Sequence, residues 1–341
     1  MTARPLRLGP GWATGVGSMP GVDPREAAAV VVGELPDLPH LPELPARGPG
    51  ADLVGRTAAL LVDLHADREP SGWRLVDRPG RDEHRAHTFL SADLDALEEA
   101  AADRPGPLKV QVVGPWTLLA SLQLPRGEPA LGDRGARRDV VASLAEGVAA
   151  HVADVRRRLP AADVLLQLDE PSLPAVLAGR IRSVSGLRTL APPDGVEAEE
   201  VVRTLVTAAG CPLVVHCCAD DPPVGLLHRA GAGGVSLDLT LPGADATTVS
   251  DELGEALEAG VVLLAGVVPA LARADLSDPG VTVEPVRRLW RRLGLRPDLL
   301  AAGAVVVTPT CGLAGADRDR SLDVLRHCRA AAQLLADDPE G

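Results

Sequence analysis

Aromatic residues are almost absent from this sequence. Its 341 residues include one Phe, four Trp and no Tyr, although 46% of them are hydrophobic. The core must therefore be built from Ala, Leu and Val. So high a hydrophobic content excludes an intrinsically disordered chain. Lysine is nearly absent as well, because Lys109 is the only lysine among 34 basic residues, a bias that we attribute to genome composition.

Positive charge and long apolar runs are also scarce. Acidic residues outnumber basic ones by 47 to 34, which gives a net charge of −13 and argues against nucleic acid as a partner. No stretch approaches the roughly 18 uninterrupted apolar residues of a membrane span. The N-terminal MTARPLRLGPGWATG lacks the apolar run of a signal peptide. We therefore expect a soluble cytoplasmic protein with no membrane partner.

Cysteine is present in an odd and small number. Five cysteines in a reducing compartment do not predict a disulfide framework, so each thiol serves either packing or chemistry. Cys211 precedes a proline ahead of an expected strand, and Cys328 falls on the last expected helix. We interpret both as packing residues.

Short β-branched runs alternate with amphipathic segments along the whole chain, which is typical of a parallel α/β sheet. We expect strands at 11–16, 36–42, 108–113, 163–168, 212–216, 234–239, 260–267 and 304–308. We expect helices at 24–33, 53–66, 91–102, 135–159, 197–209, 245–258, 284–293 and 319–336. This pattern predicts a single (β/α)8 TIM barrel over residues 1–341, with loop excursions at 67–90 and 171–196.

Metal-binding residue types follow the expected strands, at the ends where barrel active sites lie. His216 and Cys218 are one residue apart, so on an extended strand they point to the same side and Cys217 to the other. With Asp238 and Cys311 from two further strand ends, four ligands can converge. A mixture of N, S and O ligands suits zinc. The alternative is that the cysteines are small buried hydrophobic residues.

Two other strand ends carry polar groups. Asp169-Glu170-Pro171 can cap the next helix or satisfy loop amides, whereas beside a metal the acid can hold a substrate ammonium. The turn Gly15-Val16-Gly17-Ser18 is either a simple connection or part of the site. It lacks the spacing of a dinucleotide or phosphate loop, so no nucleotide is predicted.

Five segments together resemble the C-terminal catalytic barrel of cobalamin-independent methionine synthase. They are Val16-Gly17-Ser18, Gly114-Pro115-Trp116-Thr117, Gln167-Leu168-Asp169-Glu170-Pro171, His216-Cys217-Cys218 and Pro309-Thr310-Cys311-Gly312. The resemblance keeps the order of the segments and covers nearly the whole chain. It implies a barrel related to uroporphyrinogen decarboxylase and a zinc-dependent S-methyltransferase that methylates the thiol of homocysteine to form methionine.

The resemblance also assigns residues to roles. The implied zinc ligands are His216, Cys218, Cys311 and Asp238, the last standing where the family usually has glutamate. The implied contacts of the homocysteine amino acid group come from the segment Val16, Gly17 and Ser18, from Asp169 as the acid that binds the ammonium, and from Glu43 as a second acid. Trp116 either stacks on a flat donor or packs in the core.

Departures from the family pattern leave the donor and the activity open. The second, N-terminal barrel of the full-length enzymes is not in this sequence, and the seventh-strand run GVVLLAGVVPALA lacks the histidine of the family. The expected donor is methylcobalamin, a corrinoid protein or methyltetrahydrofolate. Two alternatives remain: a methyltransferase for another small thiol such as a coenzyme thiol, and a non-catalytic zinc-binding accessory barrel. A metal-dependent hydrolase is disfavoured, since its sites use histidine and carboxylate more than thiolate.

Overall fold

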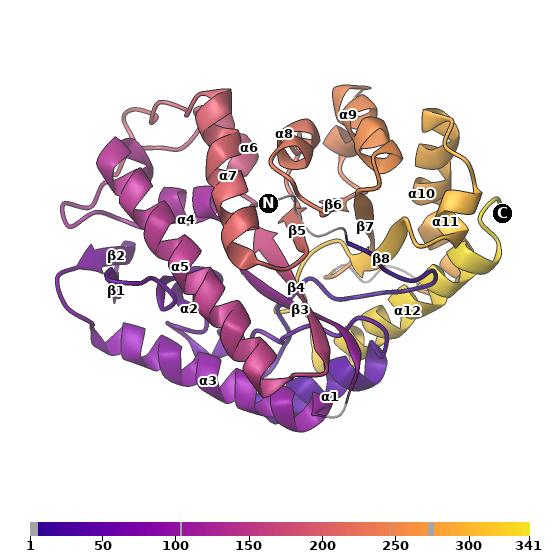
Figure 1. The fold of residues 1–341 in the computed structure, drawn as a ribbon, viewed down its shortest axis with the longest axis horizontal. Coiled ribbons are helices and arrows are strands. Elements are labelled where there is room, and N and C mark those ends of the chain that lie inside the picture. Colours follow the sequence, from indigo (N-terminus) through magenta and orange to yellow (C-terminus); the bar gives the residue numbers. More distant parts are fainter. Residues whose placement is uncertain (1–5, 103, 246, 272–275) are drawn as a thin grey trace.

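Six parallel strands form a curled sheet at the centre of the molecule (Figure 1), in the order β3-β4-β5-β6-β7-β8. They are β3 (Gly106–Val113), β4 (Ala162–Asp169), β5 (Leu213–Cys217), β6 (Gly234–Asp238), β7 (Val262–Val268) and β8 (Val305–Pro309). Each strand pairs with the next one along the chain, in the register of a parallel sheet. Six of the expected strands are therefore confirmed.

The computed structural model describes residues 6–102, 104–245, 247–271 and 276–341. Three sequence expectations touch residues outside this set: 1–5 of the stretch considered for a signal peptide, 246 of the helix expected at 245–258, and 272 of the seventh-strand run. Among the described residues, no helix is both long and apolar enough to cross a membrane. The single-domain organisation and the cytoplasmic location stay predictions.

Helices connect the strands and lie around the sheet (Figure 1). They are α1 (Pro24–Glu34), α2 (Leu53–Ala58), α3 (Arg81–Ala101), α4 (Pro115–Ser121), α5 (Arg134–Arg158), α6 (Leu173–Leu177), α7 (Gly195–Ala209), α8 (Val224–Arg229), α9 (Thr247–Glu258), α10 (Pro279–Leu293), α11 (Asp298–Ala301) and α12 (Arg318–Asp337). Six of them begin after an aspartate whose side chain accepts a backbone N–H of the first turn: α1, α2, α5, α7, α10 and α12. This capping fixes where those helices start.

The two remaining expected strands, 11–16 and 36–42, are not regular strands. They run beside the two edges of the sheet and make isolated parallel bridges, Ala13 with Val307 and His40 with Lys109. A third bridge, between Ser18 and Glu43, joins residues that lie just after the two segments. Prolines supply the physical reason at 36–42, because they have no N–H to donate to a ladder. The parallel α/β fold is confirmed, and the eight-stranded ladder is corrected to six strands with bridging segments.

The excursion expected at 67–90 is more ordered than the sequence indicated. It contains an antiparallel hairpin of β1 (His65–Glu69) and β2 (Gly72–Val76), followed by the first half of α3. The helix expected at 53–66 accordingly ends at Ala58, and the helix expected at 91–102 begins at Arg81. The second excursion, 171–196, contains only the short helix α6, as its irregular composition predicts.

The inner face of the curled sheet changes from apolar to polar along the strands. Leu165, Val214, Val262, Leu264 and Val306 form an apolar cluster with residues near the N-terminus. Two residues further along β4, β5 and β8, on the same face by strand alternation, stand the buried polar residues Gln167, His216 and Thr308. The carboxyl ends of the strands are therefore where chemistry can collect.

Candidate active site

A cavity of about 220 Å³ opens at the carboxyl ends of the strands. Its lining consists of Val16, Gly17, Ser18, Glu43, Pro45, Leu53, Asp169, Pro171, His216, Cys218, Cys311 and Gly312. Eight residues predicted from the sequence as site residues are among them: Val16, Gly17, Ser18, Glu43, Asp169, His216, Cys218 and Cys311. Residues from five distant parts of the chain thus meet around one small space.

Three of the lining residues are of metal-ligand types and form a group. The ligand atoms of His216, Cys218 and Cys311 lie within 4.8 Å of one another, and the two Sγ atoms are 3.7 Å apart. Two sulfurs bound tetrahedrally to one zinc, each about 2.3 Å from it, would be about 3.8 Å apart. The donor set and its spacing therefore fit zinc, with three protein ligands and one position left for a substrate.

The two cysteines at the end of β5 face opposite ways, as strand alternation predicts. Cys218 lines the cavity, whereas Cys217 is buried in the hydrophobic core, where burial raises its pKa to about 12. A thiol of this kind packs and does not ligate. The His216 Nδ1 lies 2.9 Å from the hydroxyl of Ser236, a buried residue of β6. This contact orients the ring and leaves Nε2 for a metal.

The two thiols of the group act on each other. Hydrogen bonds from Cys218 and His216 lower the pKa of the Cys311 thiol to about 4, while the neighbouring sulfur raises the pKa of Cys218. Cysteine binds a metal as the thiolate, so a metal that binds to this pair would displace the thiol protons.

Two buried acids also line the cavity, and one of them, Asp169, stands beside His216 in the register of β4 and β5. Asp169 ends β4 and its Oδ1 accepts a hydrogen bond of 2.7 Å from Gln167 Nε2. Burial raises the pKa of Asp169 above its ordinary value, and burial raises that of Glu43 to about 7. Partly desolvated carboxylates facing a cavity favour a cationic ligand group.

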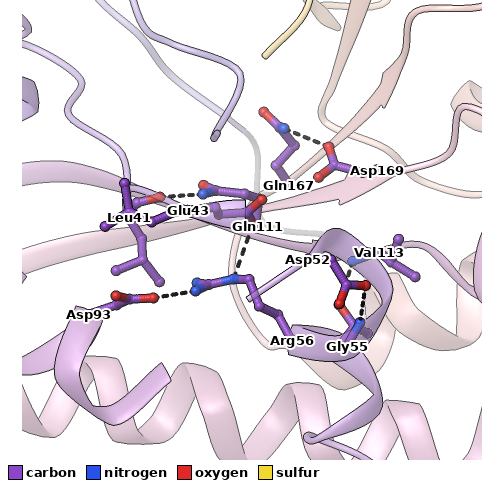
Figure 2. Close-up of polar contacts among 12 residues, drawn as sticks. Leu41, Glu43, Asp52, Gly55, Arg56, Asp93, Gln111, Val113, Gln167 and Asp169 are labelled. Atoms are coloured by element: carbon purple, nitrogen blue, oxygen red, sulfur yellow. Dashed lines mark hydrogen bonds and ion pairs between the residues drawn. The ribbon is translucent and has the colours of Figure 1, made fainter. Parts of the chain in front are cut away.

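Glu43 is held by a chain of buried charges (Figure 2). The Arg56 Nε lies 3.6 Å from Glu43 Oε1, and the guanidinium also bonds Asp93. Asp93 in turn accepts from Arg47 at 2.7 Å. The Arg56 and Asp93 side chains are both nearly inaccessible. Sequence patterns gave no signal for this chain of charges, because its members come from separate, irregularly spaced positions.

The sequence comparison identifies the family. The profile described as "Cobalamin-independent synthase, Catalytic domain" matches residues 12–334. The chain belongs to this family. No curated protein matches the sequence in a direct search.

A solved structure supports the fold. The structure of a B12-independent methionine synthase from Shewanella sp. W3-18-1, in complex with selenomethionine, is similar with a TM-score of 0.51 and 12% identity, over 79% of this chain and 71% of that one. At this identity the likeness concerns the fold alone. A GH5_18 protein from Streptomyces cattleya has a TM-score of 0.47 and 15% identity, over 96% of this chain and 81% of that one.

Two glycines explain parts of the cobalamin-independent synthase motifs. A Cβ at Gly114 would collide with the Glu170 carboxylate, which accepts from the backbone N–H groups of Trp116 and Thr117 at 2.8 Å each. Glu170 therefore anchors the start of α4 and is a structural acid, unlike its neighbour Asp169. A Cβ at Gly312 would likewise collide with the Ser18 hydroxyl.

Two predicted site residues do not meet the others in this member of the family. The Asp238 Oδ1 accepts from the Thr240 backbone N–H at 2.9 Å and from its hydroxyl at 2.6 Å, and Asp238 is outside the group of three ligands. Trp116 is fully buried, and its indole N–H donates to Ala198 O at 3.1 Å. Neither residue lines the cavity.

Proposed function

We propose that this chain is a zinc-dependent S-methyltransferase that methylates the thiol of homocysteine and forms methionine. One observation carries the proposal: a metal-ligand group and two buried acids line a single small cavity. Family membership supports the same reaction class. In this proposal zinc, held by His216, Cys218 and Cys311, keeps the substrate sulfur deprotonated and nucleophilic.

The two acids and the turn Val16-Gly17-Ser18 suit the amino acid end of homocysteine. Asp169 and Glu43 present carboxylates to its ammonium. The backbone N–H groups of Gly17 and Ser18 donate to no acceptor among the described residues, so they are available to its carboxylate. Together these groups hold the substrate and orient its sulfur for in-line attack. This role relies on proximity more than on acid or base groups.

The second candidate function is methylation of another small thiol. The cavity is smaller than the roughly 300–1,000 Å³ of sites for drug-sized ligands, so it accepts only a small acceptor. Because two acids line it, an anionic coenzyme thiol is disfavoured against one that carries an ammonium. The third candidate, a zinc-binding accessory protein, predicts the same metal group without turnover.

The donor stays open between methylcobalamin, a corrinoid protein and methyltetrahydrofolate. The run 260–272 has no histidine, so this chain needs another way to assist a folate leaving group. Donor stacking on Trp116 and ligation by Asp238 stay predictions. Asp238 would have to leave Thr240 to reach the metal, and the zinc affinity of Asp238→Ala measures whether it does.

A donor assay tests the proposal. The purified chain should contain about one zinc, and incubation with homocysteine and each donor in turn should yield methionine with at least one of them. Zinc without methionine from any donor would favour the accessory function. Product with another thiol, but not with homocysteine, would favour the second candidate. A chain that binds no zinc would overturn the proposal.

A further inference from the structure

The single lysine of the chain lies buried next to the cavity wall. Lys109 stands on β3, and its side chain is fully buried. All the remaining Lys or Arg residues of the sequence are arginines. Lysine is rarely buried in this way because taking its charge out of water costs free energy. The contacts of this ammonium should therefore reveal its use.

Two neutral acceptors bind the ammonium. The Lys109 Nζ donates to Val16 O at 2.8 Å and to Gln167 Oε1 at 2.7 Å. Neither acceptor is an acid. Asp169 and Glu43 act on Lys109 through longer-range attraction, and burial lowers the pKa of the lysine to about 7. The two hydrogen bonds of Lys109 fix the orientation of one backbone carbonyl and one side-chain amide.

The first ordered group is the Gln167 amide. An ammonium has donors only, so Gln167 must turn Oε1 toward Lys109 and Nε2 away from it. Nε2 then donates to Val16 O at 2.8 Å and to Asp169 Oδ1 at 2.7 Å. The bond between Gln167 and Asp169 is visible in Figure 2. With Oδ1 engaged, the orientation of the Asp169 carboxylate is fixed.

The second ordered group is the peptide between Val16 and Gly17. Its carbonyl accepts from both Lys109 and Gln167. In a trans peptide the C=O and the following N–H point in opposite directions. Holding Val16 O toward Lys109 therefore aims the Gly17 N–H away from it, and this N–H has no acceptor among the described residues.

We propose that Lys109 is a positioning residue for the amino acid end of the substrate. Through the Gln167 amide it fixes the acid Asp169, which faces the ammonium. Through the Val16 peptide it fixes the Gly17 N–H, which faces the carboxylate. This inference rests on the proposed function, because it takes homocysteine as the ligand. Lys109 itself does not line the cavity and does not touch the substrate.

A binding comparison of two thiols tests the role. The zinc-loaded full chain and its Lys109→Met variant are titrated by calorimetry with homocysteine and with propanethiol, which has the thiol but neither charged group. We expect the variant to bind homocysteine about 10- to 100-fold more weakly, since hydrogen bonds to two charged groups lose their geometry. Its affinity for propanethiol should be unchanged. A role in general stability would weaken both ligands alike.

Two further variants keep the test decisive. Ser143→Ala removes a buried hydroxyl on α5 that bonds Val62 O, far in the sequence from the cavity lining, and should change neither affinity. If Lys109→Met does not fold, Gln167→Met breaks the same relay and leaves the ammonium on Val16 O; the same contrast between thiols is expected.

The outcomes separate this inference from the function on which it rests. Equal weakening of both thiols, or unchanged homocysteine binding, would overturn the positioning role. If the wild type itself binds homocysteine no better than propanethiol, the proposed function fails first, and the positioning role falls with it.

Discussion

The metal-ligand group and the two acids that line the cavity are held differently. Cys218 is half-buried and Cys311 exposed, and the hydroxyl of Ser236 contacts the His216 ring. Asp169 and Glu43 are buried and held by hydrogen bonds and ion pairs that extend deep into the protein. Under the proposed function, affinity for the metal would reside in the ligand atoms themselves, whereas affinity for the amino acid end would depend on the residues behind the two acids.

The largest effect is expected from removing one member of the metal-ligand group. Cys218→Ser and Cys311→Ser each remove one of three ligands, so zinc affinity should fall by more than about 100-fold, beyond what the loss of an orienting contact costs. Metal analysis of the purified variants measures this. Cys217→Ala is the matched control and should keep its zinc, because this thiol packs in the core. Full zinc retention by both serine variants would refute the ligand assignment.

The next largest effect is expected from the acid Asp169. Asp169→Asn keeps the shape of the side chain and removes the charge that faces the substrate ammonium, so the KM for homocysteine should rise about 100-fold. Zinc content should not change, because Asp169 is not among the three ligands. Steady-state kinetics with varied homocysteine measures the effect. An unchanged KM would show that the ammonium lies elsewhere.

Sequence patterns could bring His216, Cys218 and Cys311 together for a physical reason. Strand alternation puts His216 and Cys218 on one face, and parallel strands bring their carboxyl ends to one rim, so ligand types could be placed without knowing any contact. The six regular strands were predictable on the same grounds. The segment 36–42 was not, because its prolines prevent a ladder although its leucines look like strand residues.

The residues that hold Asp169 and Glu43 in place could not be predicted from such patterns. The sequence analysis attributed Lys109 to composition, and Arg56 lies near the start of an expected helix with no distinguishing neighbour. Their roles depend on contacts with residues far apart in the chain: Lys109 with Val16 and Gln167, 93 and 58 positions away, and Arg56 with Asp93, 37 positions away. No periodicity encodes contacts of this kind.

A smaller effect should come from Ser236, which supports the His216 ring. Ser236→Ala removes the contact that orients the His216 ring, so zinc affinity should fall about 10-fold, as expected for an outer contact of a ligand. Competition with a chromogenic chelator measures it. Ser250→Ala is the control, since Ser250 is also buried but its hydroxyl has no hydrogen-bond partner among the described residues. Equal affinities of the two variants would contradict the role of Ser236.

The smallest effect concerns pH and the acid Glu43. The pKa of Glu43 is raised from an ordinary 4.5 to about 7, chiefly by burial; Arg56 and Lys109 lower it in part, and Asp169 contributes to the rise. Only the ionised form attracts the substrate ammonium, so lowering the pH from about 7.5 to about 6.5 should weaken homocysteine binding about threefold through this group.

Binding of the thiol to zinc releases a proton in the same pH range. The homocysteine affinity of the wild type therefore depends on pH for this reason as well. Glu43→Gln keeps that dependence and removes the one due to the acid, so the difference between the two proteins isolates Glu43. Calorimetric affinities at both pH values provide the measurement. If the homocysteine affinity of the two proteins changes equally with pH, Glu43 does not contact the ammonium. Asp169 alone would then supply the negative charge for it.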